Sequence, residues 1–454
     1  MPTNIAMSAI DATQVLSLVY IDAEDLLWAY SQDSVGVWND KASVPLPAGA
    51  TGVGVQGLDN ILFLLAQAPD PNNPVGTVGQ LFFALPDSTQ PSGWGGFTAL
   101  PPVPPAIYGG GAIVSLNIID FSAAVNGDGV YLVSFAGSTG ALGSTATPIY
   151  AQIGSVVGGL WNSLFPPTNL PGQPQQPSVN SDLPLQGGQS LVAAGFATNG
   201  NPVVMAALGT ETTPPILMAW YATHPLFYQW QQAAPPPLGF DLSGPPPFDP
   251  NGPPPQPITS ATAITLTKGN APGGGAALWA IALTNGVANF GMLGPSAIPP
   301  PITGVFGLPI ALFDSAGDGS TWTLTNSQDD LPSGTFPYWE AGYVVNVATG
   351  FQANSENLQV ALLGGWNGQI PLLVWQDGTG DWQYYFLNDS GNDFDPLPFF
   401  PNDGAGYATQ AVGMSFGQSL QIGYLGSDGK IYINYQDAAG NWDGYFGLDG
   451  NGLP

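Results

Sequence analysis

Short apolar runs alternate with turns rich in Gly, Pro and Asp along the whole chain, and this pattern predicts β-strands. In residues 431–436 the odd positions are Ile, Ile and Tyr and the even ones are Tyr, Asn and Gln, as in a half-buried strand. Residues 61–65 and 202–207 are continuously apolar, which indicates inner strands covered on both faces. Frequent Gly and Pro disfavour helices throughout, so the predicted fold class is all-β.

One hairpin signature, Q-D-x-x-G-x-W, recurs in register with its flanking strands. Asp and Gly suit a turn in which φ changes sign, and Trp, a residue favoured in strands, restarts the chain after it. The strict copies are Gln32-Asp33 to Trp38, Gln376-Asp377 to Trp382, and Gln436-Asp437 to Trp442. Three copies of one hairpin predict an internally repeated architecture.

Four-strand units recur along the chain with a period near that of propeller blades. Their predicted starts lie near residues 4, 51, 113, 189, 258, 302, 342 and 407. Such a repeat predicts a single β-propeller over residues 1–454. Because residues 258–300 lack a clear fourth strand, we expect seven or eight four-stranded antiparallel blades. The Pro-rich stretch 235–257 is predicted to form a stiff surface loop.

The charge balance excludes two classes of partner. The 454 residues include 3 Lys or Arg and 31 Asp or Glu, which gives a formal net charge of −28. Three basic residues cannot neutralise a nucleic acid backbone or form a polybasic membrane patch. No apolar run reaches the roughly 18 residues of a spanning helix, so membrane insertion is not expected either.

Location and acid stability are also constrained by the charges. The first basic residue is Lys41, so no classical signal peptide is visible. With few ion pairs to lose, acidification should mainly relieve repulsion, and we expect the protein to be at least as stable near pH 4 as at pH 7. With so few basic residues, the chain also has few sites at which trypsin can cut, which suits a setting outside the cell where proteases are present. These traits favour an extracellular or cell-surface location by another export route, with the cytoplasm as the alternative.

The repeated unit resembles the bacterial propeller lectins of the Photorhabdus type and, more distantly, the tectonin and fungal fucose-lectin propellers. The residues that carry this resemblance run from Gly426-Ser-Asp428-Gly429 through Gln436 to Trp442, with copies at 358–386, 302–339 and 13–38. The resemblance implies glycan binding in clefts between neighbouring blades, where Trp rings stack on sugars. The fungal fucose sites use an Arg, and this chain has none, so fucose binding by that mode is not expected.

The recurring Trp and Gln-Asp residues are the candidate ligand-binding groups. An aromatic ring suits the apolar face of a sugar, and amides and carboxylates suit its hydroxyls. Weak sites repeated around a ring would gain avidity. The alternative is that these side chains only hold the hairpins and pack between blades. The candidates are Trp38, Trp382, Trp442, Gln32, Asp33, Gln376, Asp377, Gln436 and Asp437.

Catalysis and cofactors are not expected. His224 is the single His and lies in a predicted turn, where a lone His is more often a turn residue than a base, and there is no Cys to act as a nucleophile. The oxygen-rich loops 388–395 and 314–319 leave a structural Ca²⁺ open, although neither completes an EF-hand pattern. The sequence therefore predicts a non-enzymatic lectin-like propeller whose partners are glycans, with homo-oligomerisation left open. The alternative function is a structural or self-assembling surface protein.

Overall fold

The structure, a computed structural model, describes residues 4–9, 16–33, 37–58, 60–103, 106–107, 113–138, 148–171, 192–210, 213–223, 229–233, 261–270, 276–284, 310–315, 320, 323–324, 359–365, 368–376, 382–387, 394–396, 408–416, 419–426, 428–436 and 442–448. Every regular element within these ranges is a strand. These ranges therefore contain no helix that could cross a membrane. The Pro-rich stretch 235–257 lies outside the described residues.

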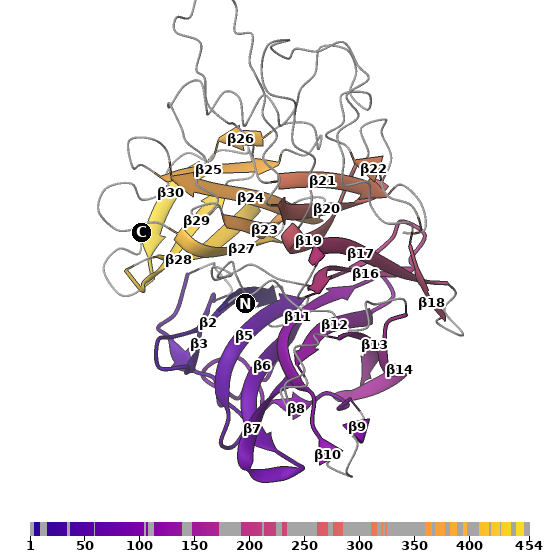
Figure 1. Ribbon diagram of the computed structural model, residues 1–454. Helices are drawn as coiled ribbons and strands as arrows, with labels where there is room; N and C mark the ends of the chain where they lie inside the picture. The colour runs from indigo at the N-terminus through magenta and orange to yellow at the C-terminus, as the bar shows by residue number, and fades with distance from the viewer. Residues whose placement is uncertain are drawn as a thin grey trace, which may run out of the picture.

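The strands form four-stranded antiparallel sheets in which the order follows the chain (Figure 1). The first four sheets, blades 1 to 4, come from the N-terminal half. Blade 1 contains β1 (Ile5–Ala9), β2 (Leu16–Ile21), β3 (Leu27–Ser31) and β4 (Ala42–Ser43). Blade 2 contains β5 (Thr51–Leu58), β6 (Ile61–Asp70), β7 (Asn73–Ala84) and β8 (Thr98–Ala99). Blade 3 contains β11 (Asn117–Val125), β12 (Val130–Ser138), β13 (Ile149–Val157) and β14 (Leu160–Asn169). Blade 4 contains β15 (Val192–Phe196), β16 (Pro202–Thr210), β17 (Thr213–Thr223) and β18 (Gln229–Gln232).

Three more sheets, blades 5 to 7, complete the set in the described part of the chain. Blade 5 contains β19 (Ala261–Asn270), β20 (Ala276–Thr284), β21 (Ile310–Ser315) and β22 (Thr323–Leu324). Blade 6 contains β23 (Gln359–Gly365), β24 (Gly368–Gln376), β25 (Trp382–Leu387) and β26 (Phe394–Pro396). Blade 7 contains β27 (Ala408–Phe416), β28 (Ser419–Gly426), β29 (Ile431–Gln436) and β30 (Trp442–Gly447). A two-stranded ribbon of β9 (Ala106–Ile107) and β10 (Ile113–Val114) precedes blade 3.

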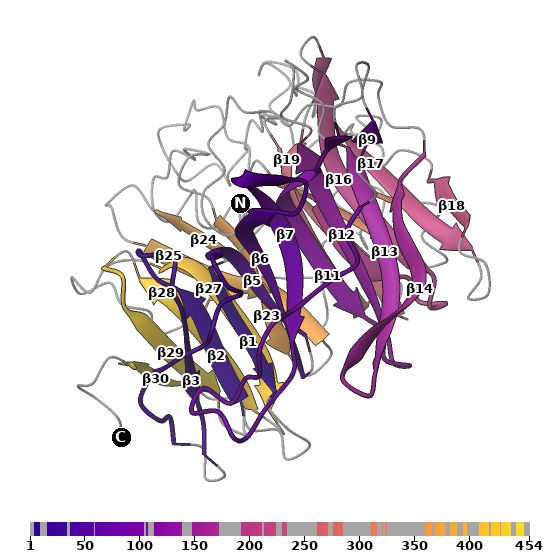
Figure 2. The same ribbon diagram turned by 90° about the horizontal axis from the view of Figure 1, so that it is seen from below.

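The blades close into a ring through their inner strands. Strand β1 contacts β5, β5 contacts β11, β11 contacts β15 and β15 contacts β19. The ring continues from β19 to β24 of blade 6, then from β23 to β27, and β27 returns to β1. Figure 2 shows the indigo strands of blade 1 beside the yellow strands of blade 7. The predicted all-β propeller is confirmed, with seven four-stranded sheets among the described residues.

The core lies between blades rather than within one. Leu62 and Leu64 of β6 pack with Val19 and Ala29 of blade 1. On the opposite face of the same strand, Phe63 belongs to a cluster that is shared with blade 3. The side chains of β6 point alternately toward blade 1 and toward blade 3, and both environments are apolar. Every position of the strand therefore needs an apolar residue, which explains the continuous apolar run at 61–65.

Glycines allow the closest approach between neighbouring blades. A Cβ at Gly57 of β5 would overlap the backbone carbonyl of Met7 in β1. A Cβ at Gly79 of β7 would overlap the carbonyl of Ile118 in β11 in the same way. Glycine at these two positions therefore sets the spacing from blade 1 to blade 2 and from blade 2 to blade 3.

The predicted repeat starts can be compared with the first strand of each blade. Those strands begin at residues 5, 51, 117, 192, 261, 359 and 408. Positions 302 and 342 lie outside the described residues. The strand that follows position 302, β21, pairs with β20 and is the third strand of blade 5. The chain from 258 to 324 thus supplies one sheet.

Candidate functional site

The recurring Q-D-x-x-G-x-W signature forms the same cross-strand pair in each strict copy. Gln and Trp lie opposite each other in antiparallel register, which confirms the predicted hairpin. The pairs are Gln32 with Trp38, Gln376 with Trp382, and Gln436 with Trp442. In blade 7 this hairpin joins the third and fourth strands, whereas in blade 6 it joins the second and third.

The copy in blade 1 is a packing element in the structure. Gln32 is buried, and its Nε2 donates a hydrogen bond to Oε1 of Gln421 in blade 7 at 3.0 Å. Trp38 is only 4% exposed and lies in a cluster with Ile431 and Ile433 of blade 7. Its ring therefore offers no free face for a sugar to stack on. Gln32 and Trp38 therefore pack between blades, which is the alternative to sugar binding that the sequence left open.

The exposed Asp33 stabilises the turn. Its Oδ1 accepts a hydrogen bond from the backbone N–H of Val37 at 2.9 Å, and its own N–H donates to the Val37 carbonyl at 2.8 Å. Asp377 and Asp437 lie outside the described residues, as do the side chains of Gln376, Trp382, Gln436 and Trp442. A binding role for these six residues stays a prediction.

Further Trp residues are also inserted against the preceding blade. Trp94 of blade 2 is fully buried, and its Nε1 donates to Oγ of Ser17 in blade 1 at 3.0 Å. Trp161 of blade 3 meets Phe63 and Phe83 of blade 2, with ring centroids 6.4 and 6.0 Å apart. Much of the Trp content in the described blades therefore serves packing between blades.

A different set of residues recurs between blades 1 and 7. One constant numbering offset relates Gln32 to Gln436 and Trp38 to Trp442, and the same offset relates Trp28 to Tyr432. The strand pairing agrees, because Trp28 lies opposite Ser43 and Tyr432 lies opposite Gly447, the residue at the same offset from Ser43. Trp28 and Tyr432 thus occupy equivalent positions, just after the turn between the second and third strands.

In blade 1 the side chains of Asp22, Trp28 and Lys41 come together, and we call them the Trp28 unit. Trp28 Nε1 donates to Asp22 Oδ2 at 2.6 Å. The other carboxylate oxygen, Oδ1, accepts hydrogen bonds from the backbone N–H groups of Glu24 at 3.0 Å and Leu26 at 2.9 Å. Lys41 Nζ lies 5.1 Å from the centroid of the half-buried Trp28 ring, within the range of a cation–π contact.

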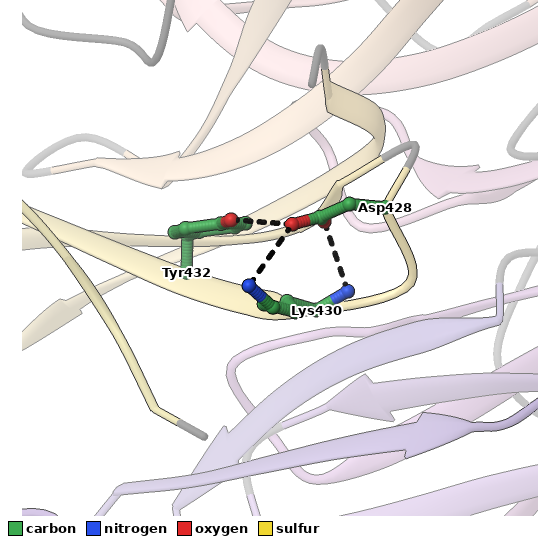
Figure 3. Close-up of polar contacts among 3 residues, drawn as sticks. All are labelled: Asp428, Lys430 and Tyr432. Atoms are coloured by element: carbon green, nitrogen blue, oxygen red, sulfur yellow. Dashed lines mark hydrogen bonds and ion pairs between the residues drawn. The ribbon is translucent and has the colours of Figure 1, made fainter. Parts of the chain in front are cut away.

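Blade 7 repeats this chemistry with Asp428, Lys430 and Tyr432, which we call the Tyr432 unit (Figure 3). The Tyr432 hydroxyl donates to Asp428 Oδ2 at 2.7 Å. Lys430 Nζ lies 3.6 Å from the same oxygen, and the Lys430 backbone N–H donates to Oδ1 at 3.1 Å. Tyr432 is buried and stacks on Tyr424 with centroids 5.1 Å apart, so its hydroxyl edge rather than its face meets the acid.

The Trp28 unit lies where two blades meet. Trp28 packs against the cluster that joins blade 1 to Ile431 and Ile433 of blade 7. Tyr432 alternates with Ile431 and Ile433 along β29, so it lies on the opposite face of that strand, away from blade 1. Both units therefore combine an aromatic ring, a carboxylate and an ammonium on the face of a blade that is turned toward the preceding one.

Sequence reasoning did not bring the residues of these two units together. The aromatic residues of the two units share the constant offset, but the acids and the lysines do not, because they come from different places along the two blades. The constant offset between the first and last blades is the signal that could have found the aromatic positions. The scarcity of Lys is a second signal, since two of the three basic residues belong to these units.

No group of three metal-ligating side chains occurs in the part of the chain that the structure describes. Most residues of the oxygen-rich loops 388–395 and 314–319, and His224, lie outside it. The arrangement of the described residues can bind polar ligands through a carboxylate and an aromatic surface. The expectations about Ca²⁺ and about catalysis stay predictions.

Comparison with known proteins supports the fold. No family model and no curated protein matches the chain. Among solved structures, the BP39L lectin from Burkholderia pseudomallei is 12% identical with a TM-score of 0.55, over 98% of this chain and 99% of that one. The Aleuria aurantia lectin is 9% identical with a TM-score of 0.37, over 97% and 94%. A Hadza microbial sialidase is 11% identical with a TM-score of 0.42, over 90% and 73%. At 12% identity the likeness to the BP39L lectin shows the propeller fold alone, and the narrower resemblance to the Photorhabdus type stays a prediction.

Proposed function

We propose that this propeller binds glycans without modifying them, through weak sites repeated between its blades. The observation that carries the proposal is that the aromatic residues at equivalent positions of blades 1 and 7, Trp28 and Tyr432, each donate a hydrogen bond to a nearby carboxylate. Its architecture is also that of the BP39L lectin. A role in binding glycans fits a location outside the cell or on its surface, which we include in the proposal.

The Trp28 unit has the chemistry that a sugar needs. Its half-buried indole keeps apolar surface next to solvent, and the Asp22 carboxylate beside it can accept hydrogen bonds from hydroxyls. The Asp22 carboxylate is held by two backbone N–H groups and the indole N–H, so little side-chain freedom is lost on binding. Tyr432 and Asp428 form a second, more polar unit, in which the ring is buried and the carboxylate is the group that a sugar can reach.

A glycan array tests the proposal. The wild-type chain should give reproducible sugar-class signals that Trp28→Ala and Asp22→Asn weaken. Tyr221→Ala is the matched control, because this half-exposed tyrosine of blade 4 donates its hydroxyl to Gln231 Oε1 at 2.8 Å and lies outside both units. Trp382→Ala and Trp442→Ala test the remaining predicted residues in the same assay. A blank array at pH 4.5 and pH 7, with and without Ca²⁺, would contradict glycan binding.

A second candidate function, self-association into an assembly, is favoured by one observation. Strand β14 is the outer strand of blade 3, carries no charged residue in a chain of net charge −28, and exposes Leu160 and Leu164. The part of this edge strand before its two prolines, residues 160–165, is uncharged and can pair with its own copy in antiparallel register. Light scattering should then show concentration-dependent dimers or larger particles that Leu164→Lys disperses. A monomer at every concentration would exclude this use of β14.

A further inference from the structure

The two aromatic–carboxylate units share a feature beyond glycan recognition: each already holds an ammonium group. Lys41 Nζ lies over the Trp28 ring at 5.1 Å, and Lys430 Nζ lies 3.6 Å from Asp428. The two lysines reach their units from different places, one from before β4 and the other from the turn before β29. Lys41 and Lys430 are not at equivalent positions, but lysine is scarce in this chain and two of its three basic residues meet these units, which indicates that the units accept an ammonium group.

We propose that the units recognise glycans carrying free amino groups, such as polymers of glucosamine. This inference rests on the proposed glycan binding and names the class of sugar. A protonated amino group would take the place of the lysine ammonium against the indole face or the carboxylate. In the Trp28 unit the sugar ring that carries it would lie along the exposed part of the half-buried indole, whereas in the Tyr432 unit, whose ring is buried, the amino group would meet the Asp428 carboxylate alone.

The lysines are weakly held and can be displaced. The side chain of Lys430 is 59% exposed, and its 3.6 Å separation from Asp428 is longer than a charge-assisted hydrogen bond. Lys41 is exposed as well. Exposed ion pairs contribute little free energy because water and salt screen them. A polymer that presents several ammonium groups would compete well, since each bound group raises the local concentration of the next.

The charge of the whole molecule supports a cationic ligand. A net charge of −28 with three basic residues creates a negative potential that attracts cations and repels acidic sugars. General attraction alone would not distinguish one carboxylate from another. The specific part of the proposal is therefore that Asp22 and Asp428, which adjoin aromatic rings, matter more than other acids on the surface.

Isothermal titration with glucosamine tetramer and its fully N-acetylated counterpart tests this inference. The free amine should bind at least about fivefold more tightly, and Asp22→Asn with Asp428→Asn should remove that preference. The control is Asp128→Asn, which deletes one charge from an exposed turn of blade 3 and should leave the preference intact. Lys41→Gln with Lys430→Gln should strengthen binding of the free amine, because the internal competitor is gone.

The outcomes separate this inference from the proposed function. Equal or tighter binding of the N-acetylated tetramer would overturn the amino-sugar class while leaving glycan binding intact. Weaker binding after the lysine substitutions would also overturn it, because lysine would then be a ligand contact rather than a competitor. If spermidine or oligolysine binds as tightly and the Asp128→Asn control weakens binding equally, the interaction is general charge attraction, and the inference fails. No binding of any sugar contradicts both proposals.

Discussion

Gln32 and Gln421 lie 389 residues apart in the chain and meet across the seam that closes the ring, where Gln32 Nε2 donates to Gln421 Oε1 at 3.0 Å. Both side chains are more than nine-tenths buried. Blades 1 and 7 belong to separate sheets, so no strand ladder joins them. The seam therefore depends on apolar packing, with this amide pair fixing how the two blades align.

Removing one member of this pair should destabilise the ring. We expect Gln32→Leu or Gln421→Leu to lower the free energy of unfolding by about 1–3 kcal/mol, because each leaves a buried amide without this partner. The double variant should lose less than the sum of the single losses, as measured by denaturant unfolding in a double-mutant cycle. Gln80→Leu is the control, since its side chain bonds within blade 2. Strict additivity would show that the two amides do not interact.

A methyl group at Gly57 should force two blades apart. The overlap that a Cβ would make is with the backbone of Met7, which cannot rotate away. We expect Gly57→Ala to cost about 1–3 kcal/mol by overpacking, seen as a lower thermal midpoint. The matched substitution is Gly127→Ala, where a Cβ would meet nothing within 4 Å. Equal midpoints for the two variants would contradict the close approach of β1 and β5.

Asp25 occupies a backbone conformation that suits glycine. Its φ is 59°, and the residue at the equivalent place in blade 7 is Gly429, with φ of 78°. Both end three-residue hairpin turns in which the third residue is left-handed. Asp25→Gly should therefore raise the free energy of unfolding by about 0.5–1 kcal/mol, whereas Gly429→Ala should lower it by about 1–2 kcal/mol. Asp25→Ala is the control that removes the carboxylate but keeps the strain, and it should not stabilise the protein.

The repeated hairpin was the most predictable part of the fold. Gln, Asp, Gly and Trp at fixed spacing determine a local turn, so the pairing of Gln436 with Trp442 follows from neighbouring residues alone. The position of that hairpin within its blade cannot be predicted in the same way, because local spacing carries no information about which strand of the blade lies innermost. This is why the same signature joins different strands in blades 6 and 7.

The candidate site was less predictable because its residues are brought together by the sheet. Trp38 and Trp28 belong to the same blade, and their local sequence does not show which ring is buried in the seam. Burial of Trp38 against Ile431 and Ile433 requires the first and last blades to meet, a contact between opposite ends of the chain. The place of Lys41 over Trp28 likewise depends on the chain returning beside β3 before β4 begins.

Asp87 gives a pH-dependent prediction. Its carboxylate accepts hydrogen bonds from Thr89 Oγ1 at 2.6 Å and the Thr89 backbone N–H at 2.9 Å, and these hold the pKa of Asp87 below its ordinary value of 3.8. A lowered folded-state pKa means that this carboxylate stabilises the fold above pH 3.8, and that the contribution is lost as the pH falls through the folded pKa. NMR titration should show Asp87 in the wild type ionising at lower pH than in Thr89→Val. The two proteins should differ in thermal midpoint at pH 6 and converge once Asp87 is protonated. A difference in midpoint that persists at strongly acidic pH would mean that Thr89 stabilises the turn independently of the Asp87 charge.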